Sequence, residues 1–258
     1  MNIRKAVLII VLLVALAFIS PVLAPYDPFQ SIAPPYQSPS LQHLLGTDGL
    51  GRDIFSQLLF GLRITLIVSM ASSLVSLVIG LLIGLASSLR SIPSQIVSAL
   101  IDSFIVIPPL LIMIFIASIM GPLLYSEIIA ISLSYWPQVA KTFRAETLSI
   151  LQRAYIEASV AVGGNTLWIL RKHVMRNLGH VILANYTYLL GVSIVSEAVM
   201  SFLGLADQRY FSCGMIFRYA FIQGAIYYGM WQWILAPALV ITIISYILFE
   251  ISKDILTK

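Results

Sequence analysis

The chain has 258 residues, of which 59% are hydrophobic and only 10% are charged, and its net charge is +4. Soluble domains carry about 25% charged residues, so this composition excludes an ordinary soluble globular protein. The single cysteine, Cys213, excludes an internal disulfide and an all-cysteine metal cluster. Uncharged runs follow Arg63 and Arg218, and each is longer than the roughly 20 residues that a helix needs to cross a bilayer. The sequence therefore predicts an all-α polytopic protein of the cell membrane, whose positive charge reflects membrane orientation and not affinity for nucleic acid.

The first apolar segment, residues 6–24, follows the basic pair Arg4 and Lys5. A basic start and small residues at the end of an apolar segment also occur in cleavable signal peptides. This segment has 19 residues, however, and is longer than the usual apolar region of a signal peptide. We therefore favour an uncleaved first transmembrane helix that ends at Pro21 and Pro25.

Hydropathy and charge spacing predict six membrane-spanning helices. They cover residues 6–24, 64–89, 103–121, 123–143, 178–203 and 231–250. The fourth helix needs Glu127 near its outer end and Lys141 extending from its inner end toward the lipid head groups. Gly121 and Pro122 predict a tight turn between the third and fourth helices.

Basic residues predict the orientation, because short cytoplasmic loops are enriched in Lys and Arg. With both termini in the cytoplasm, the inner side receives Arg4, Lys5, Arg90, Lys141, Arg144, Arg153, Arg171, Lys172, Arg176, Lys253 and Lys258. The outer side receives only Arg52, Arg63, Arg209 and Arg218. The chain is then one transmembrane domain, 1–258. Residues 1–63 form its N-terminal helix and an outer segment, and residues 64–258 form a five-helix core with a cytoplasmic loop at 144–177.

The outer segment, residues 25–60, is rich in proline in its first half, which predicts extended backbone. Its second half contains Asp48, Arg52 and Asp53. The glycines around them are not followed by the lysine of a phosphate-binding loop, and the two aspartates have no companion metal ligands. We expect a structural turn in which Asp48 caps a helix and Arg52 pairs with Asp53.

The cytoplasmic loop contains a charged, amphipathic stretch at residues 154–177. An apolar stripe at helical spacing leads into this stretch, at Leu148, Leu151, Tyr155, Ala158 and Val162. Gly163 and Gly164 are expected to end this helix, and Asn165 or Thr166 to cap the next one. Periodicity alone fits two interpretations equally: a helix that lies on the membrane with Trp168 at the head groups, or a helix on which a partner protein docks.

Part of this stretch resembles a motif of a known family. The matching residues are Glu157, Ala158, Ser159, Gly163 and His173, which resemble the EAA loop of ABC-importer permeases. Ser159 departs from that motif, which usually has a second alanine there. In the family, this loop is the cytoplasmic surface on which an ATPase subunit docks. The resemblance therefore implies an ATPase-docking site at Tyr155, Glu157, Ala158, Ser159, Gly163, Gly164 and His173.

Two further segments resemble the dipeptide/oligopeptide-type subfamily of these permeases. Residues 43–66 are similar to the segment before its second helix, and residues 196–217 to the outer end of its fifth helix. The chain departs from the subfamily at Gln57, where arginine is usual, and at Ser212 and Cys213. The resemblance implies a C-type permease subunit that works with a second permease chain, two ATPase domains and an extracellular binding protein. It implies import of di- or oligopeptides, with oligosaccharides or other solutes as the alternative.

The chain itself is expected to be neither an enzyme nor a cofactor-binding protein. No glycine is followed by lysine, so no Walker A loop is present, and ATP and Mg would be used by the partner subunit. The histidines His43, His173 and His180 are scattered, which predicts no metal site.

Polar and irregular positions within the helices predict the translocation path. Glu197 either lines the path or fixes helix packing by pairing with an arginine or a backbone group, and we favour packing. Pro108 and Pro109 predict a kink or local unwinding near the path. Gly80 and Gly84 predict close approach of the second helix to another. The competing hypotheses are an ion-coupled secondary transporter, which would show inverted repeats and several intramembrane acids, and a membrane scaffold without transport.

Overall fold

The structure, a computed structural model, describes residues 3–89 and 92–256, with side chains described at residues 8–89 and 93–256. Four basic residues of the predicted charge distribution lie outside the described side chains: Arg4, Lys5, Arg90 and Lys258. Within the described part, regular structure is helical, and one isolated β-bridge joins Thr47 to Asp53.

The helical segments follow one another along the chain with short connections, apart from the long outer segment before the second α-helix. In order they are α1 (Ile3–Ile19), the 3₁₀ turn η1 (Ser20–Leu23), α2 (Ile54–Ser87), α3 (Ile92–Ile105), α4 (Pro109–Met120), α5 (Leu124–Leu151), α6 (Ala154–Ala161), α7 (Thr166–Ile169), the π-helical turn η2 (Leu170–Val174), α8 (Met175–Asn177), α9 (Gly179–Leu203), α10 (Cys213–Ile222) and α11 (Trp231–Leu256).

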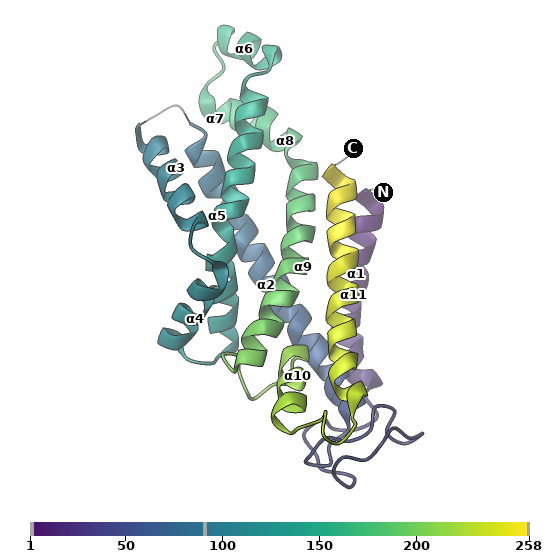
Figure 1. Ribbon diagram of the computed structural model, residues 1–258. Helices are drawn as coiled ribbons and strands as arrows, with labels where there is room; N and C mark the ends of the chain where they lie inside the picture. The colour runs from purple at the N-terminus through teal and green to yellow at the C-terminus, as the bar shows by residue number, and fades with distance from the viewer. Residues whose placement is uncertain (1–2, 90–91, 257–258) are drawn as a thin grey trace.

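The helix α2 is central: it packs against α5 and α9, and α9 packs in turn against α11 (Figure 1). Two glycines make the contact with α5 close. A Cβ atom at Gly80 would lie 2.5 Å from the Cβ of Val139, and one at Gly84 would lie 2.6 Å from the carbonyl oxygen of Ala140. Neither position has room for a side chain, so the prediction of close helix approach from the Gly-x-x-x-Gly spacing is confirmed.

The helix α2 begins at Ile54, ten residues before the predicted start at residue 64. Asp53 has extended backbone and its side chain accepts a hydrogen bond from the backbone N–H of Ser56 at 2.7 Å, which caps the helix. The predicted start was too late because hydropathy recognises only the apolar part of a helix, and the first turns of α2 lead up to the charged residue Arg63.

The predicted third span, residues 103–121, is wrong as a single helix. The chain forms α3 and α4 instead, bent by 91° at the intervening residues. Pro108 has extended backbone, with φ −57° and ψ 129°, as expected for a residue that precedes proline. Of the two predicted distortions, a kink or local unwinding, the structure confirms unwinding, because the helix is interrupted before Pro109.

Three helices in the described part of the chain are long and apolar enough to cross a bilayer, namely α2, α9 and α11. The α3–α4 pair is a fourth if it counts as one broken span. By contrast, α1 is a shorter apolar helix of 17 residues, and α5 carries four charged residues.

The two ends of the bundle differ (Figure 1). The segments α6, α7 and α8 project beyond the bundle at one end, and the described chain ends lie toward the same end. Residues 24–53 and α10 cover the opposite end.

Candidate functional site

The projecting loop begins where α5 ends. The helix reaches Leu151, and Arg153 then adopts extended backbone, with φ −77° and ψ 140°, before α6 starts. The predicted apolar stripe is therefore wrong as one continuous helical face, because this break changes the register after Leu151. Tyr155 and Val162 are exposed, and Ile156 is the side chain of α6 that is buried.

The turn after α6 has the predicted chemistry. Gly163 has φ +91°, a left-handed conformation that strains any other L-residue, and its N–H donates to the carbonyl of Val160 at 2.9 Å. Gly164 donates to the carbonyl of Ser159, also at 2.9 Å. The side chain of Asn165 accepts from the N–H of Trp168 at 2.8 Å and caps α7. The glycine break and the asparagine cap are both confirmed.

Two isoleucines fix this loop to the bundle. Ile156 on α6 and Ile169 at the end of α7 are both buried. Just beyond them, Val174 and Leu178 are completely buried and belong to an apolar cluster with Phe143 of α5. The loop is therefore an ordered extension of α5 and α9.

The opposite surface of the loop faces solvent. Glu157 and Ala158 are exposed, and Ser159 is half-buried. Large apolar side chains are exposed beside them: Val162 by 86% and Leu167 by 76%. Exposed apolar surface of this kind is typical of a site that contacts another protein or a membrane.

A cluster of aromatic rings joins α6 to the segment that follows the glycine turn. The ring of His173 lies 5.7 Å from that of Tyr155 and 5.1 Å from that of Trp168, measured between centroids. The ammonium group of Lys172 lies 4.5 Å above the Trp168 ring. Asn177 donates to the hydroxyl of Tyr155 at 3.3 Å. His173 is half-buried on the π-helical turn η2, and its ring contacts join α6 to the segment α7–α8 that follows the glycine turn. The sequence did not indicate that Trp168 and Asn177 would take part in this contact.

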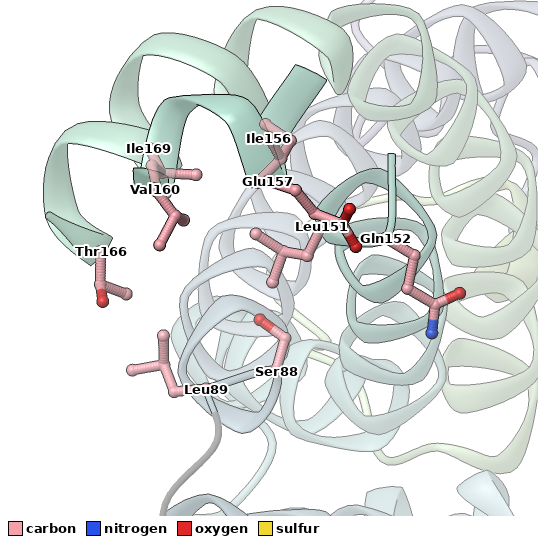
Figure 2. Close-up of a pocket in the computed structure, with 9 residues that line it drawn as sticks. All are labelled: Ser88, Leu89, Leu151, Gln152, Ile156, Glu157, Val160, Thr166 and Ile169. Atoms are coloured by element: carbon pink, nitrogen blue, oxygen red, sulfur yellow. The ribbon is translucent and has the colours of Figure 1, made fainter. Parts of the chain in front are cut away.

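A cavity of about 470 Å³ lies between the loop and the C-terminal ends of α2 and α5. Figure 2 shows the nine residues around it: Ser88, Leu89, Leu151, Gln152, Ile156, Glu157, Val160, Thr166 and Ile169. The lining is mostly apolar, and among the described residues that line it Glu157 contributes the only charged group. Glu157 thus belongs both to this cavity and to the exposed surface of α6.

The outer segment forms a turn, but its two aspartates have exchanged the predicted roles. Asp48, which was expected to cap a helix, is completely buried and accepts hydrogen bonds from the side chains of Arg52 at 2.6 Å and Gln57 at 2.9 Å. Asp53, which was expected to pair with Arg52, caps α2 and contacts His43 at 2.9 Å. The pairing of Arg52 with Asp53 was wrong because the side chain of Asp53 is already occupied by the helix N-terminus.

Glu197 lies completely buried in α9, away from the projecting loop. One of its carboxylate oxygens accepts from the hydroxyl of Ser201 at 2.6 Å. Ser212, just before α10, donates to the same Ser201 hydroxyl at 2.8 Å. The residue therefore occupies a packed polar centre, although its partner is a serine and not the arginine or backbone group that we expected.

A second buried carboxylate fixes the loop between α9 and α10. Glu127, at the start of α5, accepts from the backbone N–H of Asp207 at 2.7 Å, a contact that the sequence did not indicate. Asp207 also pairs with Arg209 at 2.6 Å. The hydrogen bonds from the Arg209 guanidinium hold the pKa of the Asp207 carboxyl below its usual range.

Comparison with known proteins decides the family. The family described as "binding-protein-dependent transport system inner membrane component" matches residues 76–258 of this chain. The chain belongs to this family. As a member, it is a multi-pass membrane permease component of such a transport system and not a catalytic subunit.

Similar chains carry related names. A putative peptide transport system permease protein of Brucella suis is 29% identical over 93% of this chain and 82% of that protein. The dipeptide transport system permease protein DppC of Bacillus subtilis is 31% identical over 92% of this chain and 75% of its own length. The glutathione transport system permease protein GsiD of Pectobacterium atrosepticum is 34% identical over 78% of this chain and 68% of its own length.

Solved structures show the same fold. A chain of the MetNI methionine ABC transporter in an inward-facing conformation superimposes with a TM-score of 0.61, covering 77% of this chain and 96% of that chain. The sequences are 20% identical, so this similarity concerns the fold alone. The helical fold is thus shared with a chain of a known ABC transporter.

Proposed function

We propose that this chain is the permease subunit of an ABC importer that carries di- or oligopeptides delivered by an extracellular binding protein. Membership in a binding-protein-dependent transport family supports the importer, and the peptide, dipeptide and glutathione names of similar chains support the substrate class. Import of oligosaccharides or other solutes by the same machinery is the second candidate.

The main structural support for this proposal is the projecting loop. The surface around α6 is ordered, exposed and apolar around Glu157, and it lies at the end of the bundle toward which both chain ends are directed. We assign it as the coupling helix, on which an ATPase subunit docks through Glu157, Ala158, Ser159 and the glycine turn. Tyr155 and His173 support this surface through the ring cluster.

The proposal includes a topology of six spans. We assign α1, α2, the α3–α4 pair, α5, α9 and α11 to the membrane, with both termini and α6 in the cytoplasm. The end bearing residues 24–53 and α10 then faces outward, where it would meet the binding protein. The surplus of basic residues on the assigned inner side supports this orientation.

The assembly follows from what the chain lacks in sequence. Its motifs include no Walker A loop, so ATP would be hydrolysed by two partner ATPase domains. Each ATPase domain needs one coupling helix, and this chain supplies one. A second, related permease chain would therefore complete the complex and enclose the path.

The test is uptake by the reconstituted complex of this chain with its partner permease, ATPases and binding protein. Glu157→Lys is expected to leave membrane insertion intact and to abolish both ATPase binding and ATP-driven uptake. Lys253→Glu, at the exposed inner end of α11, is the matched charge-reversal control and should transport normally. Normal uptake with Glu157→Lys would refute the docking assignment, and uptake without ATP would favour a secondary transporter.

A further inference from the structure

An exposed ion pair lies on the side of the bundle formed by α3 and α5. The ammonium group of Lys141 on α5 lies 2.8 Å from a carboxylate oxygen of Asp102 in the last turn of α3. The two side chains are 60% and 53% exposed. The neighbouring helix α4 instead exposes apolar side chains, such as Leu111 and Phe115, as expected for a surface in contact with lipid.

In the proposed topology, the ion pair lies at membrane depth, toward the cytoplasmic end of the bundle. On α2, Gly80 and Gly84 contact the turn of α5 that contains Val139 and Ala140, which immediately precede Lys141. With α5 entering the membrane at Leu124, as in the proposed topology, Lys141 lies about 25 Å along that helix at 1.5 Å per residue, which is inside a hydrocarbon core of about 30 Å. Charged groups at such a depth are costly in lipid and normally face the bundle interior or a water-filled cavity.

Lys141 does not have the arrangement predicted for a side chain that reaches for the head groups. Its ammonium group ends on Asp102, which lies ten residues into α3 from the inner end of that helix. Asp102 is too short to extend to the membrane surface by itself. The pair therefore needs water or another polar surface beside it.

The helix break gives an independent indication of water on the same side. The backbone is not helical between the end of α3 at Ile105 and the start of α4, and the side chain of Val106 is 81% exposed. Irregular backbone at membrane depth occurs only where protein covers it or where it lines a water-filled cavity. The break begins at Val106, four residues after Asp102.

A cavity of about 430 Å³ opens beside the ion pair. Its lining residues are Ile105, Gln138, Lys141, Thr142, Ala145 and Glu146. Gln138 and Thr142 are exposed on the face of α5 that carries Lys141. This lining offers an ammonium group, a carboxylate, an amide and a hydroxyl, which suits a polar solute better than lipid chains.

We propose that this face lines the aqueous translocation path, and that Asp102 and Lys141 form a paired-charge subsite for a zwitterionic solute. The proposal rests on the transport function proposed above. A solute with an ammonium and a carboxylate group can bind Asp102 and Lys141 respectively, so that each charge exchanges one partner for another. A singly charged solute would leave one of the two residues without a counter-charge.

The first experiment measures water access in the assembled complex. Gln138→Cys and Thr142→Cys are treated with N-ethylmaleimide in lipid nanodiscs, and the modified fraction of this chain is followed by mass spectrometry. Phe115→Cys is the lipid-facing control, and the native Cys213 is buried. Because only the thiolate reacts, the path positions should react more than about tenfold faster than the control.

Unreactive cysteines at 138 and 142, with and without ATP, would overturn the proposal and would mean that lipid or the second permease covers this face. This result is independent of the proposed function. A complex that shows no ATP-driven uptake would refute the importer assignment even if the cysteines react. A complex that transports normally with unreactive cysteines would refute the path assignment alone.

The second experiment measures the subsite. Dialanine is added to the inward-facing complex without binding protein, so that selection by the binding protein does not interfere. Dialanine is expected to slow modification of Thr142→Cys, roughly halving the rate when its concentration equals its Kd. N-acetyldialanine amide, which has no charge, should protect much less, and Asp102→Asn should remove the difference. Equal protection by the two compounds would overturn the paired-charge subsite.

Discussion

Removal of the Asp48 carboxylate should open the outer segment. Asp48 is completely buried and accepts from the backbone N–H groups of Leu50 and Arg52 and from the side chains of Arg52 and Gln57. Asp48→Ala would leave the guanidinium of Arg52, whose side chain is only 11% exposed, without its counter-charge. Loss of one partner of a buried ion pair destabilises the folded state by about 3–5 kcal/mol.

This free energy predicts a measurable change in local opening. Since every 1.4 kcal/mol corresponds to a factor of ten, the open population of residues 46–57 should rise by about a hundredfold to several thousandfold. Hydrogen exchange of peptides from this segment, recorded by mass spectrometry in lipid nanodiscs, would report that rise as faster exchange. Asp48→Asn should also be destabilising, because its amide group would place a donor against the donors of Arg52 and Gln57.

The matched control is Asp27→Ala in the same outer segment. Asp27 is exposed, and its side chain accepts a hydrogen bond from the N–H of Phe29. Its removal should change stability by no more than about 0.5 kcal/mol. The double variant Asp48→Leu with Arg52→Met, which removes both charges, should recover much of the lost protection. If Asp48→Ala exchanges no faster than Asp27→Ala, the argument from a buried counter-charge is refuted.

Three further predictions concern packing, topology and pH. Gly84→Leu should overpack the contact between α2 and α5, destabilise the protein by about 1–3 kcal/mol and lower its melting temperature in detergent, whereas an unchanged melting temperature would contradict the close approach. A cysteine introduced by Ser38→Cys should react in whole cells with an impermeant reagent, and one introduced by Asn165→Cys should not; the reverse pattern would contradict the proposed orientation. Arg209→Gln should destabilise the loop around Asp207 at neutral pH, because the ionised carboxyl with its lowered pKa contributes stability there. The difference in stability between the variant and the native protein should vanish as the pH falls through that lowered pKa. Melting curves recorded across this pH range would test the last prediction, which fails if the difference persists in acid.

Features that depend on neighbouring residues could be predicted from the sequence. Runs without charge indicated a multi-pass membrane protein, because the length of an apolar helix follows from composition alone. Gly163 and Asn165 indicated the end of one helix and the start of the next, since a left-handed turn and an N-cap need particular residue types. The spacing of Gly80 and Gly84 indicated a close helix contact, although not that α5 would be the partner.

Features that depend on distant partners needed the folded chain. Asp48 and Asp53 lie five positions apart, and local preference alone allows either residue to cap a helix that starts directly after it. The choice follows from contacts with Gln57 and His43, which become available only when the outer segment folds over the helix end. Likewise, the exposed pairing of Asp102 with Lys141 spans 39 residues and exists because the proline break turns α3 toward α5. Local patterns specify which elements form, whereas burial and charge pairing depend on which surfaces meet.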